Sequence, residues 1–329
     1  MSERQRTDEQ RWKHSLNPGF LAGEEAVKCR YVYVSRSAMR PTSPLRYPGG
    51  KGSLSAFLAD LLELNDLTGC AYYEPYAGGA GAALNLLSQG TVSRVHINDA
   101  DPRVAALWWA MLNDNDRFVD CIYAAPLDID EWRRQQSICA AADSGDSFAL
   151  GFAAFYMNRC NRSGVLKGAG PIGGYAQDGK WRLDVRFNRD ELASKIRDIG
   201  ALRDRIEVTG LDAIEFLKRC LPQGRARARA FVYADPPYVI KGQKLYLNAY
   251  EPQDHAELAR YLDRQCVLPW LVSYDDAALI RSLYARHQID LLPIRYSLQS
   301  KRAAQELLIA PQRVYLPAAS RTARIARVA

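Results

Sequence analysis

AYYEPYAGGAGAALNLL, residues 71–87, contains the pattern that decides the fold. A short run of strand-forming residues leads into a glycine-rich turn, and an alanine- and leucine-rich segment with helical spacing follows. The next run, RVHIND at residues 94–99, is a second predicted strand that ends in an acid. PRVAALWWAML then predicts a helix with a proline in its first turn. This alternation is typical of an α/β unit with a parallel sheet.

The alternation extends in both directions from this unit. A helix is predicted over residues 53–64, and strands and helices alternate again from residue 205. Between residues 136 and 204 a helical segment leads into a long stretch rich in glycine, arginine and lysine. A structureless stretch of this length inside a compact domain is usually functional.

These patterns predict one domain with an interruption. We expect a doubly wound, Rossmann-like α/β domain formed by residues 41–135 and 205–316, with an inserted region at 136–204. Residues 1–40 show no sustained period and are predicted to be an N-terminal extension. Residues 317–329 contain arginines three apart and are predicted to be a basic tail.

Composition narrows the classes of protein and partner. The chain is 48% hydrophobic and 25% charged, as in ordinary globular proteins, and its net charge of +7 favours a polyanionic partner such as nucleic acid. No apolar run is long enough to span a bilayer, and the first residues, MSERQRTDEQ, lack the apolar centre of a signal peptide. The seven cysteines are scattered and form no C-x-x-C pair. We therefore predict a cytoplasmic protein, nucleoid-associated when bound to DNA, with no membrane contact, disulfide framework or metal site.

The loop RYPGGKGS, residues 46–53, resembles a phosphate-binding loop in composition. The triphosphate-loop pattern is G-x-x-x-x-G-K-[ST]. Aligned on Gly50 and Lys51, its first position is Leu45 and its last is Gly52, so the pattern is absent. The loop therefore predicts an anion or close backbone contact without identifying a nucleoside triphosphate.

The turn at residues 74–81 follows a predicted strand and opens a predicted helix, where nucleotide-like ligands bind an open α/β sheet. A tight turn that needs glycine explains this turn alone equally well. Asp99 ends the next strand and is placed to accept hydrogen bonds from ribose hydroxyls, with Asp101 as an alternative. The combination favours an adenosine-type ligand, and NAD, FAD and S-adenosylmethionine all fit it.

The motif Asp235-Pro236-Pro237-Tyr238 follows the apolar run at residues 231–234. Two consecutive prolines cannot continue a sheet ladder, so the chain leaves the strand in a rigid loop. An ordinary strand exit is one interpretation. The functional interpretation starts from the exocyclic amine of a base, which is a poor nucleophile because its lone pair is delocalised into the ring. Asp235 and the Pro236 carbonyl would accept its N–H groups, Tyr238 would stack on the base, and in duplex DNA the base would be flipped into the pocket.

RYPGGKG, EPYAGGAG, IND, GLD and ADPPY occur in this order, followed by SYDD and ELLIA. The ordered set resembles the Dam-type (D12 class) DNA adenine N6-methyltransferases over residues 44–312. The resemblance implies a Rossmann-like methyltransferase sheet with an inserted target-recognition region, S-adenosylmethionine as methyl donor and double-stranded DNA as substrate. A monomer in solution is expected, with a cognate restriction endonuclease or a defence-system component as a candidate partner.

The resemblance also implies roles for individual residues. Lys51 would bind the carboxylate of the donor, residues 74–81 would wrap its methionine part, and Asp99 and Asp212 would contact ribose and adenine. The implied cofactor-binding residues are Tyr47, Pro48, Gly49, Lys51, Glu74, Pro75, Tyr76, Gly78, Gly79, Asp99, Asp212 and Asp235. The implied catalytic residues are Asp235, Pro236, Pro237 and Tyr238.

The family places its target-recognition region where the insertion falls. Asn158-Arg159 resembles the start of that region, but residues 160–162, Cys-Asn-Arg, replace the aromatic and glycine-rich continuation of GATC-specific members, so GATC specificity is not predicted. Basic and aromatic residues here suit phosphate contact, base reading or wedging, although any single arginine has more often a solvated or packing role. The predicted DNA-binding residues are Asn158, Arg159, Asn161, Arg162, Lys167, Tyr175, Trp181 and Arg186.

Three alternatives remain open at this stage. N4-cytosine methylation uses similar chemistry, although a serine more usually stands where Asp235 stands. RNA base N-methyltransferases also carry a D/N-P-P-Y motif, and a catalytically silent DNA-binding protein would share the fold. A C5-cytosine enzyme needs a cysteine nucleophile, usually after a proline, and no cysteine here follows one. An NAD-dependent oxidoreductase gives no reason for the motif at residues 235–238.

Overall fold

The computed structural model describes residues 43–46, 50–142, 145–240, 250–295 and 303–317. All of these residues belong to one of the two units into which the chain divides, the unit Met39–Ala329. The predictions for the N-terminal extension, for Tyr47, Pro48 and Gly49, and for the tail from residue 318 therefore lie outside the described residues.

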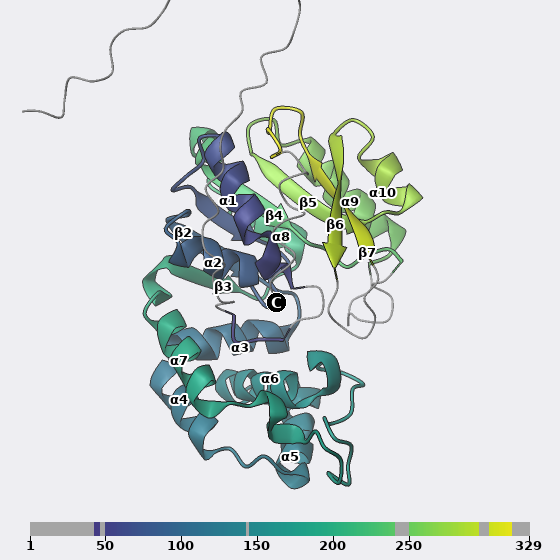
Figure 1. Cartoon of the computed structure of the whole chain (residues 1–329). Helices are drawn as coiled ribbons and strands as arrows, with labels where there is room; N and C mark the ends of the chain where they lie inside the picture. Colours follow the sequence, from purple (N-terminus) through teal and green to yellow (C-terminus); the bar gives the residue numbers. More distant parts are fainter. Residues whose placement is uncertain (1–42, 47–49, 143–144, 241–249, 296–302, 318–329) are drawn as a thin grey trace, which may run out of the picture. The chain divides into compact units, whose positions relative to one another are not determined.

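A seven-stranded sheet with the order β3-β2-β1-β4-β5-β7-β6 forms the centre of the second unit (Figure 1). The first five strands are parallel to one another, and β7 lies antiparallel between β5 and β6. The strands are β1 Ala71–Glu74, β2 Arg94–Asn98, β3 Ile206–Thr209, β4 Ala230–Ala234, β5 Trp270–Asp275, β6 Gln288–Arg295 and β7 Ala303–Ala310. Apart from β7, this is the doubly wound order 3-2-1-4-5-6. The predicted α/β class with a mostly parallel sheet is confirmed.

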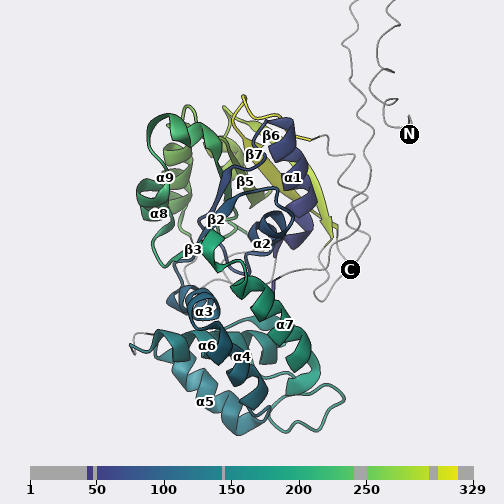
Figure 2. The ribbon, with the colours of Figure 1, turned by 90° about the vertical axis from the view of Figure 1, so that its left-hand side faces the viewer.

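Helices cover both faces of the sheet, and Figure 2 shows α1 and α2 on one side and α8 and α9 on the other. These flanking helices are α1 Ser55–Leu64, α2 Gly81–Ser88, α3 Pro102–Asn113, α8 Ala213–Cys220, α9 Pro252–Asp263 and α10 Ala278–Leu283. Side chains alternate across β4, because Phe231 and Tyr233 join one core cluster and Val232 joins the other. Strands buried on both faces read as continuous apolar runs, which explains the sequence AFVYA of β4.

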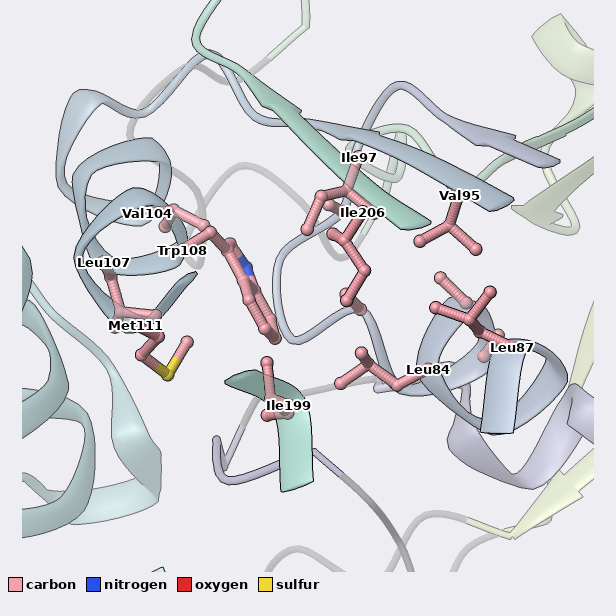
Figure 3. Close-up of a cluster of buried hydrophobic side chains, with 14 of the residues drawn as sticks. Leu84, Leu87, Val95, Ile97, Val104, Leu107, Trp108, Met111, Ile199 and Ile206 are labelled. Atoms are coloured by element: carbon pink, nitrogen blue, oxygen red, sulfur yellow. The ribbon is translucent and has the colours of Figure 1, made fainter. Parts of the chain in front are cut away.

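α3 extends one core cluster beyond the sheet. Figure 3 shows Val104 and Trp108 of α3 facing Ile97 of β2, Ile206 of β3 and Leu84 of α2. This packing fixes α3 against the edge of the sheet formed by β2 and β3, and it makes α3 the support on which the inserted helices lie.

The insertion is a helical layer packed on α3. It contains α4 Asn115–Ala124, α5 Ile129–Ala140, α6 Ser147–Cys160 and α7 Arg189–Gly200. The layer begins earlier in the chain than residue 136, because Phe118 of α4 packs against Phe148, Phe152 and Phe155 of α6. α3 and α6 cross in near backbone contact at Gly151, where a Cβ atom would lie 2.4 Å from the Ala106 carbonyl oxygen.

Short 3₁₀ helices complete the described elements. They are η1 Lys51–Leu54, η2 Arg162–Gly164, η3 Leu183–Arg186, η4 Arg203–Arg205 and η5 Gly224–Arg229. Across the described ranges, the longest helices are too short or too polar for a membrane span.

Candidate active site

Topology brings two of the predicted motifs together. β1 pairs with β2 on one side and with β4 on the other, so the direction in which the sheet is built reverses between β1 and β4. Ligands bind open α/β sheets at such a point, beyond the carboxyl ends of the strands. The glycine turn at residues 74–81 follows β1 and the motif at residues 235–238 follows β4, so both lie at this switch point.

The glycine turn lies in close backbone contact with η1. Gly78 and Ala80 have positive φ angles of 45° and 44°, and Ala80 is the N-cap of α2. A Cβ atom at Gly81 would lie 3.2 Å from both the Cα and the N atom of Gly52, so only glycine permits this approach without displacing a neighbour. The Asn85 Nδ2 atom of α2 donates to the Gly52 carbonyl of η1 at 3.3 Å and ties these two helices together.

Asp99 lies directly against the glycine turn. Its Oδ2 atom accepts from the Gly78 N–H and its Oδ1 atom from the Asp101 N–H, both at 2.9 Å. Burial raises the pKa of Asp99 to about 6. Asp101 instead caps α3 and forms an ion pair with Arg103 at 2.6 Å. Of the two acids considered for a ribose contact, Asp99 is therefore the one that faces the turn.

Asn98 joins the loops that follow β1 and β3, a role that motif reasoning missed. Its buried amide nitrogen donates to the carbonyls of Pro75 and Leu211, and its oxygen accepts from Leu211 N–H and the Thr209 hydroxyl. The available signal was an amide side chain at the end of the predicted strand RVHIN. Asp212 lies in the second of these loops and caps α8, accepting two backbone N–H groups through Oδ1.

Asp235 is held by three side chains, two of which come from distant parts of the chain. Its Oδ1 atom accepts from the Ser273 hydroxyl at 2.6 Å and from the Tyr238 hydroxyl at 3.3 Å. Its Oδ2 atom lies 2.9 Å from Lys51 Nζ, which also donates to the Tyr238 hydroxyl at 2.8 Å and lies 3.7 Å from Glu306 Oε2. The Asp235 carboxylate is 15% exposed, whereas the side chains of Lys51 and Glu306 are 6% and 0% exposed.

Lys51 is an internal cation in this cluster. Burial alone lowers the pKa of its amine, but the carboxylates of Asp235 and Glu306 outweigh burial and raise the pKa above its ordinary value. Lys51 was predicted to bind a ligand carboxylate, and the structure instead places it beside two carboxylates of the protein. Sequence reasoning did not assign Ser273 or Glu306 a role, because SYDD and ELLIA were recognised only as part of a motif order.

The backbone after Tyr238 is fixed by β5. The two carboxylate oxygens of Asp275 accept from the N–H groups of Val239 and Ile240 at 3.0 and 2.8 Å. Pro236 and Pro237 have no N–H group to donate, so these backbone hydrogen bonds come after the two prolines in the chain. The geometry makes the motif at residues 235–238 a rigid platform at the edge of the sheet.

Glu74 and the hydrogen-bonded pair Tyr76 and Tyr250 also lie at the switch point. Glu74 at the end of β1 is buried, and burial followed by the Asp235 carboxylate raises its pKa well above the ordinary value. The hydroxyl groups of Tyr76 and Tyr250 lie 2.7 Å apart, which ties the turn after β1 to the segment before α9. Behind them, His255 Nδ1 lies 2.9 Å from the Tyr274 hydroxyl of β5. The predicted site residues Glu74 and Tyr76 are thus part of the same region as Asp235.

Asn158 and Asn161 are buried, so neither side chain is accessible to a duplex in this structure. The Asn158 amide accepts from Arg46 N–H at 2.8 Å and donates to the carbonyls of Arg46 and Gly164, each at 2.9 Å. The Asn161 amide accepts from the Trp132 indole and donates to a backbone carbonyl. Both asparagines hold loops in place, which corrects the expectation that their side chains contact DNA directly.

Three arginines gather at the junction between the loop before α1 and the insertion. Arg159 donates to the carbonyls of Arg186 and Pro44 at 2.7 and 3.1 Å. Burial, and then the positive charge of Arg46, lower the pKa of Arg159 to about 10. Burial and the Arg186 charge likewise lower the pKa of Arg46. Mutual repulsion between Arg46, Arg159 and Arg186 would be relieved by an anion at this junction.

Four predicted DNA-binding residues lie on the surface of the insertion. Tyr175 and Trp181 are 61% and 60% exposed, and Arg162 and Lys167 are exposed as well. The loop that carries the two aromatic rings is organised around Gln177, which donates to the carbonyls of Ile172 and Gly174 and accepts from Leu183 N–H. Exposed rings on an ordered loop are suited to stacking on bases.

The sequence matches no model of a known protein family, and no curated protein matches it significantly. The order of the motifs and the geometry of the site are therefore the basis for assigning a function.

Proposed function

We propose that this protein is an S-adenosylmethionine-dependent DNA methyltransferase that methylates the N6 amine of a flipped adenine. The observation that carries the proposal is the position of Asp235, at the end of β4 and beside the glycine turn that follows β1. An acid acceptor for an amine is thereby placed next to a surface suited to a nucleoside. The motif order that resembles the Dam-type enzymes supports the same assignment.

The residues at the switch point fit the methyl donor. Gly81 and Gly52 approach each other closely and carry no side chains, so backbone atoms form the surface there. Beside it, the half-buried Asp99 carboxylate accepts a hydrogen bond from Gly78 N–H. Asp99 would accept hydrogen bonds from the ribose, and residues 74–81 would lie along the methionine part. When bound, the donor supplies a methyl group on a positively charged sulfur. We assign Lys51 to the Asp235 cluster rather than to the donor carboxylate.

Asp235 and the Pro236 carbonyl would orient the adenine amine. Each accepts one N–H, which points the nitrogen lone pair towards the methyl group, and such alignment provides a large part of the rate enhancement in group transfer. Ser273, Tyr238 and Lys51 fix the Asp235 carboxylate before the base arrives. The rigid backbone after Tyr238 keeps the Pro236 carbonyl in place.

Arg46, Arg159 and Arg186 would contact the DNA backbone. Their clustering suits a phosphate group, and arginine is the preferred side chain for such contacts. The exposed Arg162, Lys167, Tyr175 and Trp181 would contact neighbouring bases or phosphates. A base within a duplex is out of reach of Asp235, so these contacts would hold the helix while the adenine is extruded.

The decisive experiment measures the methylated product. Purified protein is incubated with S-adenosylmethionine and unmethylated genomic DNA, with total RNA and the Asp235→Ala variant in parallel, and nucleosides are identified by mass spectrometry. We expect N6-methyladenine in DNA and none with Asp235→Ala, whose donor affinity by calorimetry stays near the wild-type value. Methylcytosine or a methylated RNA base would overturn the substrate assignment. An unchanged rate in Asp235→Ala would remove the role given to that carboxylate.

A further inference from the structure

Ser273 is a buried serine that contacts the Asp235 carboxylate from the neighbouring strand. It lies in β5, next to β4, and its hydroxyl donates to Asp235 Oδ1 at 2.6 Å. The Tyr233 hydroxyl lies 2.8 Å from the same Ser273 Oγ atom. Tyr233 and Ser273 are both 0% exposed, whereas the Asp235 side chain is 15% exposed. The three groups form a chain of hydrogen bonds that runs from the core to the candidate active site.

The pairing of β4 with β5 brings these three side chains together. Side chains two residues apart along an extended chain point to the same side, and Asp235 is two residues after Tyr233. Asp235 precedes Pro236, which favours an extended backbone at Asp235. Leu271 of β5 is paired with Tyr233, so Ser273, two residues further along β5, is level with Asp235.

Each hydrogen bond in the chain has a defined direction. A serine hydroxyl has a single hydrogen, and Ser273 donates it to Asp235. The contact between the two hydroxyl groups is therefore made by the hydrogen of Tyr233. Tyr233 thus holds the Ser273 hydroxyl in the orientation in which its hydrogen faces the carboxylate, and hydrogen bonds in such a chain strengthen one another.

We propose that Tyr233 and Ser273 are positioning residues for methyl transfer: Tyr233 orients Ser273, and Ser273 fixes the plane of the Asp235 carboxylate. The inference rests on the proposed function and extends it from the site into the core. The other two contacts of the carboxylate define its plane less well. Lys51 Nζ, 2.9 Å from Oδ2, is a compact charge on a flexible stem. The Tyr238 hydroxyl, 3.3 Å from Oδ1, belongs to the same loop as Asp235.

The plane of this carboxylate matters because two acceptors would hold the adenine amine. Asp235 and the Pro236 carbonyl would each accept one N–H, so a rotated carboxylate would turn the nitrogen lone pair away from the methyl group. A misplacement of about 1 Å can reduce the rate of a reaction by roughly 100-fold. Ser273 lies inside a buried strand, so its hydrogen bond fixes Asp235 relative to the sheet.

Packing alone does not explain the two buried hydroxyl groups. Phenylalanine at position 233 and alanine at position 273 would fill nearly the same space. Each buried hydroxyl carries a desolvation cost that its hydrogen bonds must offset, and apolar side chains avoid this cost. The flanking residues Val232 and Val272 of the same strands are apolar and buried. The hydroxyl groups of Tyr233 and Ser273 are therefore explained by the carboxylate that they reach.

The test compares Ser273→Ala, Tyr233→Phe and the double variant in single-turnover assays on unmethylated genomic DNA with saturating S-adenosylmethionine. Ser273→Ala is expected to slow methyl transfer by roughly tenfold, because a hydrogen bond to a charged group is lost. Tyr233→Phe is expected to slow it by about twofold to threefold, because Ser273 keeps its contact with Asp235 and loses only its orienting partner. The double variant should be as slow as Ser273→Ala and no slower, because Tyr233 acts through Ser273.

Affinity and stability distinguish positioning from a structural role. The affinities for the demethylated donor, by calorimetry, and for DNA, by fluorescence anisotropy, are expected to stay at their wild-type values in all three variants. Ser273→Ala leaves the buried Tyr233 hydroxyl without this partner and should lower the midpoint of thermal unfolding by a few degrees. The double variant removes that hydroxyl and should recover the midpoint but not the rate.

Tyr156→Phe is the matched control for loss of a buried tyrosine hydroxyl. The Tyr156 hydroxyl donates to the Pro126 carbonyl at 2.9 Å within the helical layer, and the residue is 0% exposed. This variant is expected to methylate DNA at the wild-type rate. An equal loss of rate in Tyr156→Phe and Tyr233→Phe would contradict a specific role for Tyr233.

Three further results would overturn the inference. They are a rate that recovers together with the midpoint of unfolding, a double variant slowed by the product of the two single effects, and a loss of donor affinity as large as the loss of rate. Should Ser273→Ala not fold, as judged by its thermal transition, the double variant provides the comparison, since it does not bury the Tyr233 hydroxyl. A double variant at the wild-type rate would contradict the inference.

The outcomes also separate this inference from the proposed function. If the wild type methylates adenine in DNA and Ser273→Ala matches its rate, the inference fails while the function stands. If the wild type forms no N6-methyladenine, the proposed function fails and the inference fails with it.

Discussion

At the scale of single residues, the spacing of motifs predicted which side chains lie at the switch point. Strand endings locate Glu74, Asp99 and Asp235, because the carboxyl ends of parallel strands meet at one edge. Sequence could not predict that Lys51 and Glu306, separated by most of the chain, share one ion-pair cluster. That contact depends on how the last strand enters the sheet, which local patterns do not specify.

Asp99 combines its proposed role in binding with a cost in stability. Burial raises its pKa from an ordinary value of 3.8 to about 6, so the folded chain favours the protonated form. Its contribution to the free energy of unfolding is complete below pH 3.8 and is lost as the pH rises through about 6. We expect Asp99→Asn to remove this pH dependence from the thermal transition.

Asp99→Asn is also expected to weaken binding of the donor or its demethylated product by roughly tenfold to a hundredfold above pH 6. The reason is that the charged carboxylate, which would accept hydrogen bonds from the ribose, is lost. Calorimetry at two pH values on either side of 6 measures the effect. Asp101→Asn is the matched control, since Asp101 caps α3 and pairs with Arg103. Equal weakening in both variants would contradict the assignment of Asp99 to the ligand.

At the scale of elements, helical periodicity predicted the flanking helices but not the extent of the insertion. α4 and the first part of α5 belong to the helical layer because their apolar faces pack on α6 and α7, and periodicity does not reveal a packing partner. Asn158, near the end of α6, was interpreted as a DNA contact because the sequence around it is polar and basic. Its burial depends on tertiary packing, which the sequence pattern does not reveal.

Asn158 joins the end of α6 to the loop before α1, so its loss is expected to act on both. In Asn158→Ala, the Arg46 N–H and the carbonyls of Arg46 and Gly164 lose their partner, which should lower the free energy of unfolding by about 1–3 kcal/mol. Denaturant titration measures this change. Arg162→Ala, a change at an exposed side chain, should leave stability unaltered and weaken DNA binding. An Asn158→Ala variant as stable as the wild type would show that the three hydrogen bonds are dispensable.

At the scale of the whole molecule, composition predicted a polyanionic partner but not where it binds. The net charge is +7, and only the structure shows that Arg46, Arg159 and Arg186 lie near one another. The strand order was equally beyond the sequence pattern. β7 lies between β5 and β6, although it follows both in the chain.

DNA binding is expected to weaken steeply with salt, because each phosphate contact releases counterions. Arg186→Ala should reduce the slope of log Kd against log salt by about 0.9, the value for one phosphate contact. Arg225→Ala is the control, since this exposed arginine lies in η5, before the amino end of β4 and away from the carboxyl ends of the strands. Fluorescence anisotropy over a salt series measures both. A flat salt response in the wild type, or equal slopes in the two variants, would contradict a phosphate contact at Arg186.

The antiparallel position of β7 also has a consequence for biosynthesis. β5 and β6 are both translated before β7, yet β6 joins the sheet, and β5 gains its second neighbour, only through β7. A nascent chain that ends before Ala303 therefore presents β5 as an open edge, the kind of edge at which chains associate wrongly. Glu306, which lies 3.7 Å from Lys51, arrives on that same strand, so the ion-pair cluster and the sheet are completed together.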